Sequence, residues 1–96
     1  MTFTTMTITD VANYLRLGTL TTSEENFLTT ILNSAKSYVL KYTGLTEIQA
    51  DLANELVIAV LVLCQDMYDN RALYVDSDNV NKVVETILGM HSINLL

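Results

Sequence analysis

The amino-acid sequence predicts an all-α protein: a small bundle of about four helices with a long buried central helix, an extended N-terminal arm and a short C-terminal tail. Three observations lead to this fold class. Apolar residues recur at helical spacing, Thr-x-x-Glu and glycine signals bracket the periodic segments, and proline is absent. The 96 residues suit a single domain over residues 1–96. We expect helices over about residues 9–17, 22–43, 47–71 and 79–89.

The N-terminal segment is rich in threonine, with five in the first nine residues, MTFTTMTIT. Because β-branched side chains favour extended backbone, this segment is expected to form an arm or an edge strand. Thr9 or Asp10 can cap the helix that follows, and Gly18 is expected to stop it soon after Leu17. The first helix is indicated by apolar residues spaced three, one and three apart, at Ile8, Val11, Ala12 and Leu15.

The second helix has signals at both ends. Thr22 and Glu25 have the spacing of a capping box at its start. Lys41 suits the negative end of the helix dipole, and Gly44 suits the left-handed residue that closes a helix. One apolar stripe joins the two ends, through Phe27, Leu28, Ile31, Leu32, Ala35, Tyr38, Val39 and Tyr42.

The central helix is expected over residues 47–71. Its middle, from Leu56 to Cys64, has nine consecutive apolar residues, so no helical face is polar and protein should surround it. A membrane span needs about 18 to 20 such residues, so this run of nine is too short to cross a bilayer. A buried strand is the competing interpretation, but the good helix formers from Glu47 to Glu55 favour a helix. The short link at Leu45 and Thr46 predicts an antiparallel hairpin with the second helix.

The C-terminal part begins with a connection, ALYVDSDNV, whose residues 76–79 are turn formers. We reject a calcium-binding loop here. Such a loop would need glycine at position 81 and a carboxylate at position 87, where this sequence has Asn81 and Ile87. The last helix is expected to end at Gly89, and the apolar tail MHSINLL is expected to dock on the core or on a neighbour. Its periodic residues are Val80, Val83, Val84, Ile87 and Leu88.

Composition narrows the function classes. Half of the residues are hydrophobic and the mean hydropathy is positive, so part of the apolar surface is expected to face another subunit. The formal net charge is -6, and the five basic residues are scattered, which argues against tight nucleic-acid binding. An acidic wall would instead let DNA slide past. Neither a signal peptide nor a lipidation signal is evident, and the one cysteine fits an intracellular setting.

No enzyme is expected. Cys64 is interpreted as a small buried hydrophobe, and His91 is the only histidine, so neither a nucleophile with its base nor a zinc site is apparent. There is no glycine-rich phosphate loop. We therefore predict no catalytic, metal or cofactor-binding residue and no cofactor.

The polar end of the central helix, around Tyr68, Asn70 and Arg71, is the candidate site. These residues could bond across a subunit boundary, where Arg and Tyr are favoured anchors. Equally, Arg71 could cap the helix and pair with a local acid. Both interpretations stay open.

Three segments together resemble a known family: DVANYLRL at residues 10–17, AKSYVLKYTG at 35–44 and AVLVLCQDMYDNR at 59–71. In order and separation they resemble the small head-tail connector, or adaptor, proteins of long-tailed bacteriophages, also described as DNA-packaging proteins. The resemblance runs from Ile8 to about Leu88.

The resemblance implies a structural virion protein, assembled in the host cytoplasm as a twelve-fold ring below the portal in the neck. Such a ring extends the DNA channel and joins the capsid to a neck or tail completion protein, without binding DNA specifically and without a membrane. The alternative is a small helical-bundle regulatory protein that inhibits or modulates a partner protein. The inter-subunit contact candidates are Tyr68, Asn70, Arg71 and Tyr74. The candidates for contact with the portal or a neighbour are Met90, His91, Ile93, Leu95 and Leu96.

Overall fold

The computed structural model describes residues 2–73, 75 and 80–91. Within these ranges the chain is helical and contains no strand, which confirms the all-α prediction. The helices are α1 (Ile8–Tyr14), α2 (Thr22–Thr43), α3 (Glu47–Asp51), α4 (Glu55–Asn70) and α5 (Lys82–His91).

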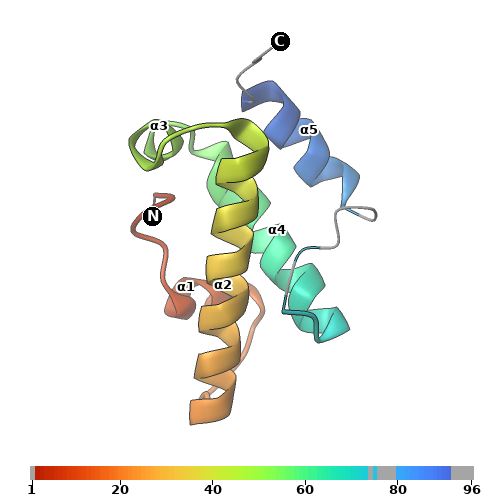
Figure 1. Ribbon diagram of the computed structural model, residues 1–96. Helices are drawn as coiled ribbons and strands as arrows, with labels where there is room; N and C mark the ends of the chain where they lie inside the picture. The colour runs from red at the N-terminus through yellow and green to blue at the C-terminus, as the bar shows by residue number, and fades with distance from the viewer. Residues whose placement is uncertain (1, 74, 76–79, 92–96) are drawn as a thin grey trace.

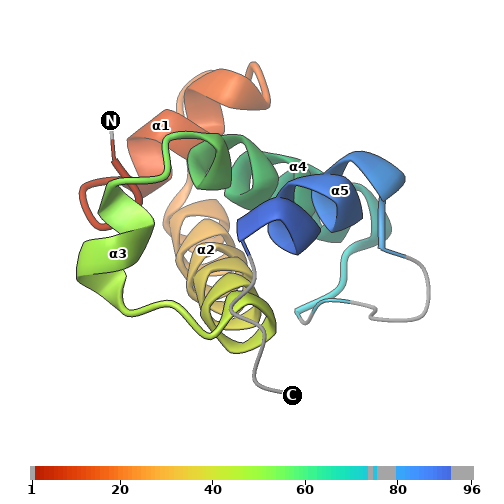
Figure 2. The ribbon, with the colours of Figure 1, turned by 90° about the horizontal axis from the view of Figure 1, so that it is seen from above.

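Helices α2, α4 and α5 run up, down and up beside one another, and α2 and α4 form the main packed pair (Figure 1). Helix α1 packs against α2 and α4 and lies level with the middle of α2 (Figure 1). Seen from above, α3 lies on one flank of this bundle and α5 on the opposite flank (Figure 2). The expected hairpin of α2 with the apolar helix is therefore present, although α3 intervenes between them.

The core lies between α2 and α4 and extends to α5 on one side and to α1 and the N-terminal segment on the other, and the apolar periodicity of the helices predicts the buried faces. Several side chains are completely buried there, and the fully buried hydroxyl of Thr43 is satisfied. Its Oγ1 donates to the Val39 carbonyl at 2.8 Å and accepts from the Leu45 N–H at 3.3 Å. The residues with no exposed surface include Val11, Leu28, Ile31, Ala35, Val39, Leu56, Ala59, Val60, Cys64, Val84 and Leu88.

The boundaries of α2 follow the sequence signals with one shift. Thr21, and not Thr22, is the N-cap, and it exchanges hydrogen bonds with Glu24, one residue before the expected Glu25. The Thr-x-x-Glu pattern occurs twice, at residues 21–24 and 22–25, and the first pair forms the capping box. At the other end Gly44 has φ 74°, the left-handed conformation that was predicted for it.

The N-terminal segment is a turn and not the expected extended arm. Phe3 and Met6 are almost completely buried, and the Met6 N–H donates to the Thr2 carbonyl at 3.1 Å. Lys36 Nζ donates to the Met6 carbonyl at 3.2 Å. Burial of two large apolar side chains thus outweighs the extended preference of the threonines.

Helix α1 begins and ends earlier than expected. Thr7 is its N-cap, so Thr9 lies inside the helix, and Asp10 contributes from the third helical position by accepting the Thr7 N–H at 2.9 Å. The chain leaves the helix at Arg16, which has φ 58°, and the Leu17 N–H donates to the Ala12 carbonyl at 2.9 Å. Arg16, in the left-handed backbone conformation, therefore marks the end of this helical segment, a role that was expected for Gly18.

The predicted continuous helix over residues 47–71 is wrong, because residues 52–54 separate α3 from α4. Thr4 holds Asp51 through two hydrogen bonds, from its N–H at 2.8 Å and from its hydroxyl at 2.7 Å. Residue propensities favour helix throughout this stretch, but the contact with the N-terminal segment directs α3 away from α4. Helix α4 keeps the buried apolar run and ends before Arg71.

Helix α5 is shifted relative to the expected 79–89. It begins at Lys82, where Asn81 Oδ1 accepts the Val83 N–H at 2.8 Å, and it runs past Gly89 to His91. The expectation that Gly89 ends the helix is therefore wrong. Apart from the backbone of α5 itself, a Cβ atom added at Gly89 would meet no described atom within 4 Å, so no described side chain fills the space beside this glycine.

Candidate interaction surfaces

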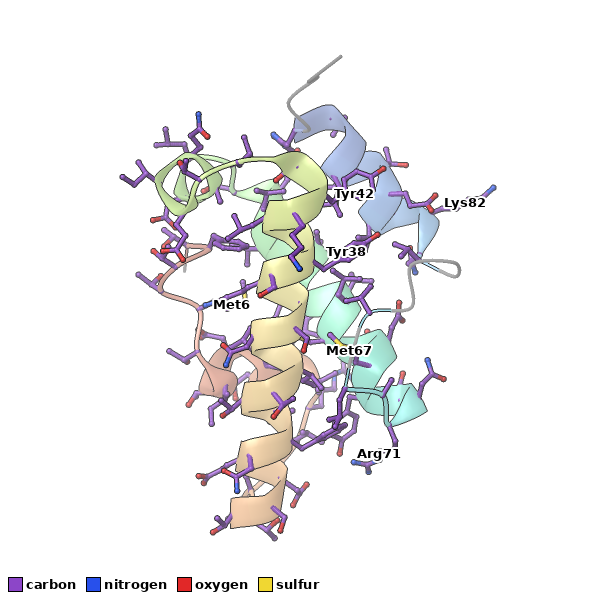
Figure 3. All side chains as sticks on the ribbon, viewed as in Figure 1. Met6, Tyr38, Tyr42, Met67, Arg71 and Lys82 are labelled. Carbon is purple, nitrogen blue, oxygen red and sulfur yellow. The ribbon has the colours of Figure 1, made fainter. Side chains whose placement is uncertain are left out.

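The C-terminal end of α4 contains an aromatic stack closed by Arg71. Arg71 lies just past the lower end of α4 (Figure 3). Its guanidinium carbon is 4.6 Å from the centre of the Tyr68 ring and 5.5 Å from the centre of the Phe27 ring. The two rings are 5.9 Å apart and tilted by 42°. Because Phe27 belongs to α2, this stack ties the end of α4 to the beginning of α2.

Arg71 is also the left-handed C-cap of α4, with φ 52°. The Ala72 N–H donates back to the Met67 carbonyl at 2.9 Å, and Ser34 Oγ on α2 donates to the Leu73 carbonyl at 2.9 Å. The chain leaving α4 is thus fastened at both α4 and α2. These contacts agree with the capping interpretation of Arg71, while its exposed side chain still offers a face to another molecule.

The other members of the candidate cluster lie differently. Asn70 Nδ2 donates to the Asp66 carbonyl at 2.9 Å, within the last turn of the same helix. Tyr74 lies outside the described residues. Burial, and then the nearby charge of Asp69, raises the pKa of Asp66, so this carboxyl holds its proton more readily than a free aspartate does. Sequence reasoning placed Phe27 in the core stripe and missed its part in the stack.

We expect replacement of Arg71 by alanine to lower the free energy of unfolding by about 1 kcal/mol, because the cation–π contacts are lost. Urea unfolding of the purified chain measures this loss. Arg71→Lys is the matched control, since it keeps the charge but not the flat guanidinium, and should fall in between. If Arg71→Ala folds as stably as the wild type yet fails to assemble, the inter-subunit interpretation is the better one.

The C-terminal candidates begin at the end of α5. Met90 is 65% exposed, whereas His91 is partly covered and its Nε2 lies 2.8 Å from Glu55 Oε2. This pair joins the last residue of α5 to the first residue of α4. Ile93, Leu95 and Leu96 lie outside the described residues. The tail therefore departs from a defined point beside the α3–α4 junction.

Helix α3 exposes two large apolar side chains that sequence reasoning assigned to a continuous core helix. Ile48 is 78% exposed and Leu52 is 84% exposed, one helical turn apart. The opposite side of α3 is fixed, since Ala50 is buried and Thr46 caps the helix through a hydrogen bond from the Gln49 N–H at 3.2 Å. Thr46 and Gln49 together form a capping box.

The bond between α3 and the N-terminal segment should be sensitive to acid. The Thr4 backbone N–H, followed by the Thr4 hydroxyl, holds the pKa of Asp51 below its usual 3.8. The folded state therefore favours ionised Asp51, which contributes stability above that usual value and loses it as the pH falls through the lower folded pKa.

We expect Asp51→Ala to be less stable than the wild type near pH 7, and the difference to shrink below about pH 4. Urea unfolding across this range measures both. Thr4→Val keeps the backbone donor and should show a smaller difference. A difference that does not change with pH would contradict the assignment.

The described residues offer little for catalysis. Cys64 is completely buried, and burial raises the pKa of its thiol to about 12, so the reactive thiolate is suppressed at neutral pH. In the part of the chain that the structure describes, no group of three His, Cys, Asp or Glu side chains could hold a metal ion. None of the described helices is long and apolar enough to cross a membrane.

These features define a small helical protein whose distinctive surfaces suit contact with other proteins. The chain matches the model of the Phage gp6-like head-tail connector protein family over residues 5–93, and it belongs to that family. The family has a structural, connecting role in the phage virion, and the membership places the chain at the junction of head and tail. No curated protein and no solved structure showed significant similarity to the chain.

Proposed function

We propose that the chain assembles into a twelve-fold ring below the portal, where it extends the DNA channel and joins the capsid to the neck or tail. The family match over residues 5–93 carries this proposal. In it the chain acts as one domain over residues 1–96, and its partners are its own copies, the portal protein and a neck or tail completion protein.

The surface of the described bundle supports self-assembly. Large apolar side chains are exposed on both flanks, with Ile48 on α3, Leu52 at the C-cap of α3, and Val83 and Met90 on α5, all more than half exposed. A ring subunit must cover two different faces, one against each neighbour. The formal net charge of -6 suits a channel through which DNA passes without binding.

The candidate residues receive separate roles in this proposal. Tyr68, Asn70, Arg71 and Tyr74 contribute to contacts around the exit of α4, either by anchoring the following segment or by touching a neighbour. The Phe27 stack supports the anchoring role, because it fixes Arg71 within its own chain. The C-terminal residues make contact with the portal or with a neighbouring copy. They are Met90, His91, Ile93, Leu95 and Leu96.

Electron microscopy of purified particles tests the proposed function. Wild-type particles should show a ring of density at the portal exit, and particles made without this chain should lack it. Supplying the chain from a plasmid should restore the ring. Wild-type particles without the chain at the head-tail junction would overturn the proposal.

A further inference from the structure

Helices α3 and α5 lie on opposite flanks of the described bundle (Figures 1 and 2), and exposed apolar side chains form a surface at each of them. The first, which we call the α3 ridge, consists of Ile48 and Leu52, the two most exposed of the large hydrophobic side chains described. The contacts of Ala50, Thr46 and Asp51 hold it in place. A ridge fixed in this way needs no reordering when a partner covers it.

The second surface, which we call the α5 face, consists of Val83, Thr86, Gly89 and Met90, all exposed. Gly89 is its unusual member. Glycine inside a helix is less favourable than alanine, and here the space beside it is open, so no contact with a described part of this chain requires it. A glycine in such a place allows another molecule to approach the helix backbone closely.

The charges beside the two surfaces are compatible. Glu47 begins α3 next to the ridge, and Lys82 begins α5 two turns before Gly89, on the same side of the helix. Glu85 is exposed and lies one turn before Gly89, so the α5 face is bordered by one base and one acid. Lys82 is the member of this pair that can face Glu47 of another copy.

We propose that the α3 ridge of one copy packs against the α5 face of the next copy, with Leu52 entering the space beside Gly89. This inference rests on the proposed ring and names the surfaces that would form it. Because the two surfaces differ and lie on opposite flanks, each copy would use one toward each neighbour. Such a head-to-tail contact closes into a ring when the rotation between copies allows it.

Substitution of Gly89 gives two effects of opposite sign. Gly89→Ala should raise the urea midpoint of the isolated chain, because alanine favours the helix and its Cβ meets no atom. The same change should weaken ring assembly at least tenfold, and Gly89→Leu should prevent it. Leu52→Asp should also prevent assembly without changing the urea midpoint. Tyr14→Ser, which changes an exposed side chain on α1 outside both surfaces, is the control and should assemble normally.

Cross-linking identifies the partner directly. Leu52→Cys and Thr86→Cys chains carrying tags of different size are mixed, assembled with the phage portal protein and treated with a short bismaleimide. Thr86 is an exposed member of the α5 face, so a cysteine there leaves the space beside Gly89 free. Only copies in contact can give the mixed product, and buried Cys64 does not compete. Tyr14→Cys on α1 mixed with Leu52→Cys is the control and should give none.

The outcomes separate the two proposals. Rings together with the mixed product are the expected result. Rings without it, rings from Gly89→Leu, or Leu52→Cys joined to the portal protein instead would overturn the pairing while leaving the ring in place. Failure of the wild-type chain to form any ring with the portal protein would overturn both.

Discussion

Removal of residues 92–96 is expected to abolish incorporation of the chain into phage particles while the bundle still folds. The described core ends at Leu88, and α5 ends at His91, so the deletion removes no described core residue. The deleted segment contains Ile93, Leu95 and Leu96. Full burial of one such side chain contributes about 1.5 to 3 kcal/mol. If docking buries only two of these three side chains, their loss would weaken binding of the tail to its partner on the order of a hundredfold or more.

The experiment compares particles assembled with full-length and truncated chain. The amount of chain per purified particle is measured by immunoblotting, and circular dichroism with urea unfolding checks the fold. Deletion also moves the terminal carboxylate next to His91 and Glu55. Serine at positions 93, 95 and 96 avoids this charge and should give the same loss. Normal incorporation of either variant would refute the docking role of the tail.

Replacement of Phe3 by alanine is expected to lower the free energy of unfolding by about 3 to 5 kcal/mol. The Phe3 side chain is only 2% exposed, and Lys36 Nζ lies 5.9 Å from the centre of its ring. A domain of this size has a total stability on the order of 5 to 15 kcal/mol. The variant should therefore unfold well below the wild-type temperature.

Urea and thermal unfolding measure this effect on the isolated chain. Phe3→Leu keeps most of the buried volume and should lose less than about 1.5 kcal/mol. The comparison separates packing from the identity of the ring. A loss below about 1 kcal/mol for Phe3→Ala would mean that the N-terminal segment joins the fold only after assembly, as an extended arm would.

Caps, apolar spacing and helix-ending glycines correctly predicted those helices whose boundaries depend on neighbouring residues in the sequence. Helix α2 has a capping box near its start, a continuous apolar stripe and Gly44 at its end, and only the choice between Thr21 and Thr22 differed. The buried run from Leu56 to Cys64 was also evident, because nine apolar residues leave no solvent face. Both elements follow from spacing and composition alone.

The separation of α3 from α4 could not be predicted in this way. Every residue from Glu47 to Glu55 is compatible with a helix, and the contact that redirects α3 comes from Thr4, far away in the sequence. The exposure of the two side chains of the α3 ridge could not be predicted for the same reason. Gly89 shows the converse, because a local stop signal lies within a helix that continues to His91.

The candidate site was predicted in part. Tyr68 and Arg71 lie together, as their spacing on α4 suggested, but Phe27 completes the stack from another helix. No feature of Phe27 separates it from the other members of its apolar stripe. Whether an exposed arginine belongs to its own chain or to a neighbour depends on long-range packing, which spacing does not encode.

The two ends of the described chain both fasten to one short stretch, with Thr4 bonded to Asp51 and His91 to Glu55. Asp51 closes α3 and Glu55 opens α4, so both fastenings flank the joint at residues 52–54. Each end is also held by apolar side chains in the core, Phe3 at one end and Leu88 at the other. A rotation of α3 relative to α4 at this joint would therefore break the Thr4–Asp51 bonds or pull the buried N-terminal segment with it.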